Sequence, residues 1–357
     1  FVPLVLNRHH FLFTPFHSLL GPPYEYIDFF YAMEKSRQIK KVFFRLFSNV
    51  WTVTDTLVLV TPTTQSRIYP ACTGIIIEKR QVGKSINNMQ KKFTYHASAI
   101  SYNVTGKGKP VVLLHGFGED AHIWDEQVTM LKEHCLLIIP DLPGSGISTM
   151  LNGEWSVVSS ELTSVTHHSP LTTHKNISIT DYADCILSIL QQENISSCTM
   201  LGHSMGGYIT LAFAEKYPSM LTGFGLIHST AFSDSEEKKK TREKAIAFIE
   251  QHGAHAFLKT SIPNLFGRRF KETHPGKINS FIAKAAGFTG EALQQYYRAM
   301  LLRPDRRSIL KSNPLPVLFV MGTDDIAAPL EEVLQQTHLP TKSYIHVLRD
   351  VGHMSML

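Results

Sequence analysis

The sequence has 357 residues, of which 43% are hydrophobic and 18% are charged, and this composition excludes a disordered or fibrous chain. The formal net charge of +5 is small for this length, and no basic stripe with interleaved aromatic residues argues for nucleic acid as a partner. The four cysteines, Cys72, Cys135, Cys185 and Cys198, form no C-x-x-C pair. We therefore expect buried thiols and a reducing, cytoplasmic location.

Residues 1–88 differ from the rest of the chain. Their most apolar window, residues 42–60, contains Arg45 and Asp55, which argues against a membrane span. Met89 then opens a segment typical of the start of a protein. We expect residues 1–88 to be upstream sequence read in frame and not part of the fold. An N-terminal extension of unknown role is the alternative.

From residue 93 onward, apolar runs of strand length alternate with helical patterns. Edge strands are expected within 93–102, and buried strands at 111–114, 136–139, 198–201, 223–228, 317–321 and 344–348. Helices are expected at 123–132, at 179–192 with Thr180 as the N-cap, and at 208–217. This alternation predicts an α/β fold with a mostly parallel sheet and helices on both faces.

Two segments interrupt the alternation. Residues 149–176 are polar and irregular, and we expect a loop insertion in which His167, His168 and His174 are solvated rather than bound to a metal. Residues 230–310 are mostly helical with charged starts, which predicts an inserted helical cap. The α/β core is then expected to comprise residues 89–229 and 311–357.

The motif G-x-S-x-G at residues 202–206 lies between an expected strand and an expected helix. This setting is typical of a nucleophile elbow, a sharp turn that exposes a serine above the sheet. Gly202 and Gly206 are expected because side chains at these positions would clash in so tight a turn. The N-terminus of the following helix would point at Ser204, where developing negative charge is stabilised.

Other polar motifs also follow expected strands, at the edge where ligands bind in parallel sheets. They contain His115 and Gly116, Asp141, Asp325 and His353. A serine hydroxyl needs a base to remove its proton, and a histidine held by a carboxylate serves this purpose. The chain order Ser204, Asp325, His353 is the order used by one fold class of serine hydrolases.

Residues 89–357 resemble the α/β-hydrolase superfamily with a helical cap, especially the bacterial group that includes esterases and C–C bond hydrolases. The resemblance depends on HGFG at 115–118, DLPGSG at 141–146, GHSMGG at 202–207, GTDDIAAP at 322–329 and GHM at 352–354. It implies that Ser204 is the nucleophile, His353 the base and Asp325, rather than its neighbour Asp324, the acid.

The same resemblance implies an oxyanion hole made by the backbone N–H groups of Phe117 and Met205. His115 and Gly116, together with Gly202 and Gly206, would shape the supporting loops, and Asp141 would order the turn after its strand. The sequence ends four residues after His353. We therefore expect the family's final helix to be missing and one apolar face of the sheet to be exposed.

The resemblance implies hydrolysis of a carboxylic ester of a small apolar substrate through an acyl-serine intermediate, with no metal or organic cofactor. A C–C bond hydrolase, a lactonase or a thioesterase would use the same triad, and a non-catalytic ligand-binding protein of the same fold is an alternative of another class. Seven cap aromatics suggest an apolar lining, but aromatics at helical spacing more often serve packing, and none of them is assigned to a pocket: Phe257, Phe266, Phe270, Phe281, Phe288, Tyr296 and Tyr297.

Overall fold

The computed structural model describes residues 89–152 and 176–357. The expectations for residues 1–88, including the apolar window and Cys72, lie outside the described residues. Most of the expected loop insertion, with its three histidines, also lies outside them.

Within the described residues, eight strands form one mixed sheet. Their spatial order is β1 (Met89–Tyr95), β2 (Ser98–Gly106), β4 (Cys135–Pro140), β3 (Lys109–Leu114), β5 (Cys198–His203), β6 (Leu221–Ile227), β7 (Val317–Gly322) and β8 (Ser343–Leu348). The pairs β1–β2 and β2–β4 are antiparallel, and all the other pairs are parallel. The predicted mostly parallel α/β sheet is therefore confirmed.

Strand β3 is the point at which the strand order reverses. It lies between β4 and β5, with Val112 opposite both Ile138 and Met200. Residues 111–114 are fully buried, as expected of a strand covered on both faces. A reversal of strand order opens a crevice beyond the carboxyl ends of the strands, and in such sheets ligands bind there. The loops after β3 and β5 therefore have the position of a binding site.

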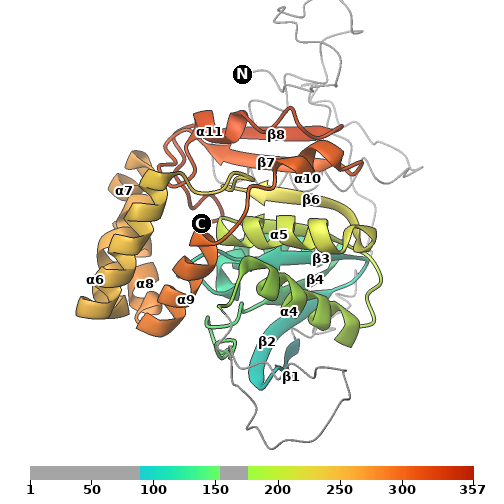
Figure 1. The fold of residues 1–357 in the computed structure, drawn as a ribbon, viewed down its shortest axis with the longest axis horizontal. Coiled ribbons are helices and arrows are strands. Elements are labelled where there is room, and N and C mark those ends of the chain that lie inside the picture. The colour runs from blue at the N-terminus through green and yellow to red at the C-terminus, as the bar shows by residue number, and fades with distance from the viewer. Residues whose placement is uncertain (1–88, 153–175) are drawn as a thin grey trace, which may run out of the picture.

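The helices of the core are short apart from α4 and α5. The core contains η1 (Ala121–Trp124), α3 (Asp125–Leu131), α4 (Ile179–Gln192), α5 (Met205–Lys216), η2 (Pro218–Met220), α10 (Arg307–Ser312) and α11 (Leu330–Leu334). Helices α4 and α5 pack against each other in front of the sheet (Figure 1).

The predicted N-cap of α4 was wrong. Ser178, not Thr180, caps this helix: its hydroxyl accepts the Asp181 N–H at 3.4 Å, and the Asp181 carboxylate accepts the Ser178 N–H at 2.8 Å. This reciprocal pair is a capping box and satisfies two backbone donors at the helix start. Thr180 lies inside the helix, and its hydroxyl accepts a hydrogen bond from Arg306 at 3.2 Å.

A group of helices separates β6 from β7 in the chain, as expected for an inserted segment. It contains α6 (Glu236–Ser261), η3 (Ile262–Leu265), α7 (Arg268–Thr273), α8 (Pro275–Ala285) and α9 (Gly290–Leu301). These helices lie together beyond the carboxyl ends of β6 and β7 (Figure 1). Gly253 interrupts α6 with φ 83° and ψ 163°, a conformation that side chains other than hydrogen rarely adopt.

A buried ion cluster ties this helical group to the core. The Asp234 carboxylate, before α6, accepts hydrogen bonds from Arg242 Nε at 2.6 Å and from Arg303 Nη2 at 2.8 Å. The Arg303 guanidinium lies 4.0 Å from the centroid of the Tyr208 ring on α5. Asp234 thus joins the first helix of the inserted group, the segment after its last helix and the core.

Within residues 89–152 and 176–357, no helix combines the length and the apolar character that crossing a bilayer requires.

Candidate active site

Ser204 occupies the sharp turn between β5 and α5. Its φ of 51° and ψ of −115° lie far from both strand and helix values. A non-glycine residue at positive φ is strained, and such strain is characteristic of functional turns. The turn is held by the Ser204 N–H, which donates to the Ile227 carbonyl at 2.9 Å, and by Ser229 Oγ, which donates to the Ser204 carbonyl at 2.7 Å.

The two motif glycines lie where backbones cross closely. A Cβ atom on Gly202 would collide with the Gly206 carbonyl group. A Cβ atom on Gly206 would lie 2.5 Å from the Leu114 carbonyl oxygen and 2.6 Å from that of His115. Because these neighbours are backbone atoms, they cannot rotate away, and only glycine fits. The motif therefore presses the start of α5 against the end of β3.

His353 and Asp325 form a buried hydrogen-bonded pair. His353 Nδ1 lies 3.0 Å from Asp325 Oδ1 and 2.9 Å from Oδ2. Burial alone would lower the pKa of His353, but the Asp325 carboxylate outweighs it, and the pKa of His353 is raised. Since Nδ1 donates to the carboxylate, Nε2 of the neutral ring keeps its lone pair. This nitrogen is the atom that could accept a proton from a serine.

The residue before Ser204, His203, contacts the segment that contains His353. His203 Nε2 donates to the His353 carbonyl oxygen at 2.9 Å, and the two rings lie 4.8 Å apart. Ser204 itself is partly exposed. Among the described residues, the Ser204 hydroxyl makes no hydrogen bond to the His353 ring. Catalytic hydrogen bonds are often long in ligand-free enzymes and tighten when substrate binds.

The loop after β3 carries the other predicted residues. His115 Nδ1 donates to the Gly116 carbonyl at 2.8 Å, while Nε2 accepts the Leu142 N–H at 2.9 Å. These two bonds fix one neutral tautomer, so His115 shapes the loop. The Phe117 N–H has no hydrogen-bond partner within residues 89–152 and 176–357. Met205 is the first residue of α5, so its N–H points out of the helix start.

Two aspartates predicted to be structural lie outside the Asp325–His353 pair. Asp141 accepts the N–H groups of Ala121 at 3.0 Å and Ile147 at 3.3 Å, so it orders the loops on both sides of it. Asp324 accepts the Arg268 N–H at 3.4 Å and the Thr323 hydroxyl at 3.3 Å. Neither carboxylate bonds to His353 in the described structure.

Comparisons with known proteins agree with this architecture. Residues 109–252 match the family model described as alpha/beta hydrolase fold. The chain is 26% identical to an esterase from Thermogutta terrifontis solved with malate bound, with a TM-score of 0.64 over 74% of this chain and 92% of that one. The chain has the α/β-hydrolase fold.

Two further relatives indicate the range of this family. The hydrolase is 22% identical over 256 residues to the (E)-2-((N-methylformamido)methylene)succinate hydrolase of Acinetobacter baylyi, covering 71% of this chain and 86% of that protein. The enol-lactonase from Burkholderia xenovorans LB400 is 20% identical, with a TM-score of 0.63 over 74% of this chain and 93% of that chain. At this identity, the lactonase structure supports the fold alone.

The α/β-hydrolase structure also contains a buried histidine that the sequence analysis did not single out. His228 follows β6, and its Nδ1 lies 2.8 Å from Asp325 Oδ2. Its Nε2 lies 2.7 Å from the Ser355 hydroxyl. The sequence did carry a signal, because His228 ends an expected buried strand in the same way as the predicted site residues do.

Glu119 and His203 form a second buried acid–imidazole pair. His203 Nδ1 lies 2.9 Å from Glu119 Oε2, which also accepts the Gly116 N–H at 2.7 Å. Burial alone would raise the pKa of Glu119, but His203 outweighs it, and the pKa of this carboxyl is lowered. Both nitrogens of the His203 ring therefore face acceptors, which calls for a proton on each. This pair connects the β3 loop, the elbow and the His353 segment.

His228, Asp325 and His353 are also the residues that could hold a metal ion, since one ligand atom from each lies within 4.8 Å of the others. In the hydrolase, however, both Nδ1 atoms point at the carboxylate at hydrogen-bond distances of 2.8 to 3.0 Å. Zinc–nitrogen bonds are about 2.0 Å long, so a cation between these atoms would have to separate the cluster. The distances between these nitrogen and oxygen atoms are those of hydrogen bonds.

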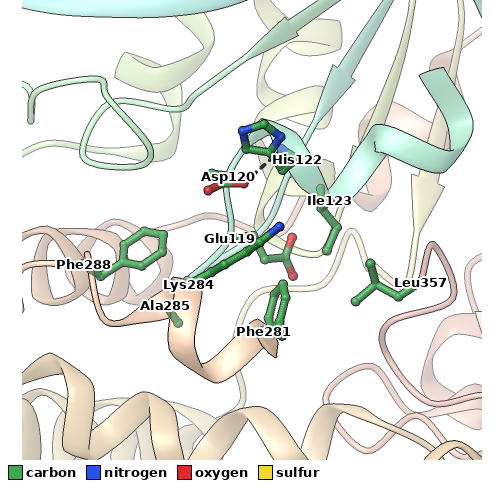
Figure 2. Close-up of a pocket in the computed structure, with 10 residues that line it drawn as sticks. Glu119, Asp120, His122, Ile123, Phe281, Lys284, Ala285, Phe288 and Leu357 are labelled. Carbon is green, nitrogen blue, oxygen red and sulfur yellow. Dashed lines mark hydrogen bonds between the residues drawn. The ribbon is translucent and has the colours of Figure 1, made fainter. Parts of the chain in front are cut away.

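A small cavity of about 60 Å³ lies between the β3 loop and the helical insertion (Figure 2). Figure 2 shows Glu119 and Ile123 on the core side, Phe281 and Lys284 on the α8 side, and Leu357 at the edge. Ser204 and His353 do not line it. Ligand pockets usually measure about 300 Å³ or more, so this space is too small for a substrate. Of its lining residues, Glu119 also bonds to the His203 ring.

Proposed function

We propose that this α/β-hydrolase is a serine hydrolase that cleaves carboxylic esters of small apolar molecules. The observation that carries the proposal is the elbow: a strained, partly exposed Ser204 beside a buried imidazole–carboxylate pair. A hydrolase of this kind is also favoured by the likeness to the Thermogutta terrifontis esterase. The proposed reaction depends on the tautomer of His353 in which Nδ1 carries the proton and Nε2 is free to accept one.

The first half of the reaction forms the acyl-serine. His353 Nε2 takes the Ser204 proton while Oγ attacks the ester carbonyl, and the same nitrogen then gives the proton to the leaving alkoxide. Asp325 holds the ring in the required tautomer and stabilises its charged form. The N–H groups of Phe117 and Met205 stabilise the tetrahedral oxyanion, each by about 3 kcal/mol. In the second half, water activated by His353 releases the acid.

The substrate side chain would meet an aromatic surface contributed by the helical insertion. The Phe117 ring stacks on Tyr297 at 4.2 Å between centroids and lies edge-on to Phe257 at 6.2 Å. These rings are adjacent to the proposed oxyanion donor, which favours an apolar acyl group. We assign residues 230–310 the role of a cap for this reason. Lactones are cyclic esters that the same triad would attack, so they are the second substrate class.

Thiol chemistry favours a reducing location. Cys135, Cys185 and Cys198 are free and buried, and burial raises the pKa of Cys135 to about 11 and that of Cys198 to about 12. Thiols of this kind are inert packing groups. We therefore propose that the hydrolase works in the cytoplasm without disulfides.

The test is hydrolysis of a p-nitrophenyl ester series of increasing acyl length by the full 357-residue chain and its Ser204→Ala variant. We expect short and medium acyl esters to be cleaved and the substitution to lower kcat/KM by about a thousandfold or more. Ser312→Ala, at an exposed position on α10, is the matched control and should leave the rate unchanged. An unaltered rate in Ser204→Ala would remove this serine from the mechanism.

A further inference from the structure

The Asp325 carboxylate is shared by two imidazole rings. Oδ2 lies 2.8 Å from His228 Nδ1 and 2.9 Å from His353 Nδ1. Oδ1 accepts the N–H groups of Ala327 and Ala328, both at 2.9 Å. A carboxylate offers about four lone-pair sites, and all of them are used here. Among the described residues, the two rings are the groups that bond to Oδ2, while Ala327 and Ala328 hold Oδ1. His228 is therefore one of the donors that fix the orientation of this carboxylate.

His228 also reaches the segment that carries His353. Its Nε2 lies 2.7 Å from the hydroxyl of Ser355, two residues after His353. Burial lowers the pKa of His228 to about 4, so the ring is neutral near pH 7. A neutral ring that donates from Nδ1 must accept at Nε2, which makes the Ser355 hydroxyl the donor. The His228 ring therefore connects Asp325 to the loop that contains His353.

The backbone of His228 has an unusual conformation. Its φ of 50° lies in the left-handed region, while its N–H donates to the Val320 carbonyl at 2.8 Å. Histidine and asparagine tolerate this region better than most residues. β6 lies between β5, which carries Ser204, and β7, which leads to Asp325. From the end of β6, the His228 side chain reaches the Asp325 carboxylate in the loop after β7.

We propose that His228 is a positioning residue of the hydrolase, which fixes the Asp325 carboxylate and through it the orientation of His353. This inference rests on the proposed function, because it assigns His228 to the same triad. His228 touches no reacting atom. Its Nδ1 donates to Oδ2 of Asp325. Without His228, the remaining partner of Oδ2 among the described residues is His353 Nδ1.

The proposal also predicts a direction for the pH dependence of catalysis. The ionisable groups around His353 are Asp325, the His203–Glu119 pair and His228, whose ring lies 5.6 Å away. Asp325 raises the pKa of His353. Loss of the His228 donor leaves more of the carboxylate's negative charge for His353, so the pKa of His353 should rise further. The acidic limb of kcat/KM should therefore move to higher pH.

The test compares two substitutions in the full chain. His228→Phe keeps the ring volume and removes the donor, and we expect kcat to fall by about 10- to 100-fold with KM nearly unchanged. His228→Asn places an N–H near the position of Nδ1 and tolerates the positive φ. It should recover most of the lost kcat and return the acidic limb towards the wild-type pH. The matched controls, His346→Phe and His346→Asn on β8, should change neither quantity.

Two readouts separate this proposal from the proposed function and from simple unfolding. NMR titration of ¹⁵N-labelled imidazoles reports the pKa of His353 without any substrate, and circular dichroism reports the fold. A raised His353 pKa in folded His228→Phe, reversed in His228→Asn, supports the proposal even if esters are not cleaved. Equal kcat in wild type and folded His228→Phe, with Ser204→Ala inactive, would overturn it and leave the serine mechanism standing.

Discussion

Asp324 and Asp325 are neighbours in the chain but have opposite surroundings. Asp325 is 5% exposed and receives His353 Nδ1 at 2.9 Å. Burial alone would raise the pKa of Asp325, but His353 and His228 hold it well below its usual range. Asp325 is therefore ionised at every pH at which an esterase works. Asp324 lies on the outer side of the turn, where it accepts the Arg268 N–H at 3.4 Å.

This contrast yields a prediction about single residues. Asp325→Asn keeps the volume but offers His353 the wrong tautomer, so kcat on a p-nitrophenyl ester should fall by about a thousandfold or more. Asp324→Asn is the matched control and should stay within about twofold of wild type. If Asp324→Asn proved the damaging change, the acid would be misassigned. Thermal unfolding of both variants distinguishes a chemical loss from a folding loss.

Their positions after expected strands nominated Ser204, Asp325 and His353, and the resemblance to a known family chose Asp325 over Asp324. Glu119 and His228 were not nominated. Glu119 matters because the fold brings it within 2.9 Å of His203, 84 positions away in the chain. A contact of that kind comes from packing, and no local pattern records it. His228 did end an expected strand, so the rule that found the other residues could have found it.

At the scale of elements, the turn between β5 and α5 depends most strictly on the identity of its residues. The start of α5 approaches the end of β3 so closely that Gly206 admits no side chain. Gly206→Ala places a Cβ atom 2.5 Å from the Leu114 carbonyl oxygen. Because the obstacle is backbone, we expect a loss of about 2 to 3 kcal/mol of stability and of most of the activity.

The matched control for this prediction is Gly276→Ala on α8, where an added Cβ meets no atom within 4 Å. Alanine is the better helix former there, so stability should rise by up to about 1 kcal/mol. Urea unfolding of the two variants measures the difference. Similar effects for both substitutions would mean that the elbow has room the structure does not show.

Elements with strong hydrophobic patterns were predictable, but their caps and breaks were not. The continuous apolar runs became the largely buried strands β3 to β7, and residues 344–348 became part of the half-buried edge strand β8. The bounds of α4 were predicted correctly as 179–192, but its N-cap was not, because Ser178 and Thr180 are both good caps and only the reciprocal bond with Asp181 decides between them. The break of α6 at Gly253 also escaped prediction. A glycine is compatible with a helix until packing requires a turn.

For the whole molecule, the order of strands and helices was enough to predict an α/β fold with a mostly parallel sheet and an inserted helical segment, and the resemblance of the motifs added the α/β-hydrolase family. The way in which that segment is attached was not predictable, because charged residues such as Asp234 and Arg303 look in sequence like surface groups. In the structure both are buried: Asp234 is 5% exposed and Arg303 is 6% exposed. Buried charges are maintained only by close partners. The attachment therefore depends on this ion cluster as well as on apolar contact.

The buried cluster of Asp234, Arg242 and Arg303 should contribute measurably to stability. Asp234→Asn removes the negative charge between Arg242 and Arg303, while Arg303 stays buried against Tyr208. Breaking a buried ion pair from one side typically costs about 3 to 5 kcal/mol, and we expect about 3 kcal/mol here because asparagine keeps one acceptor. Asp350→Asn is the control, since the Asp350–Arg349 pair is exposed and 3.9 Å long, and its loss should cost less than about 0.5 kcal/mol. Guanidinium unfolding compares the two, and equal stabilities would show that the helical insertion is held by apolar packing alone.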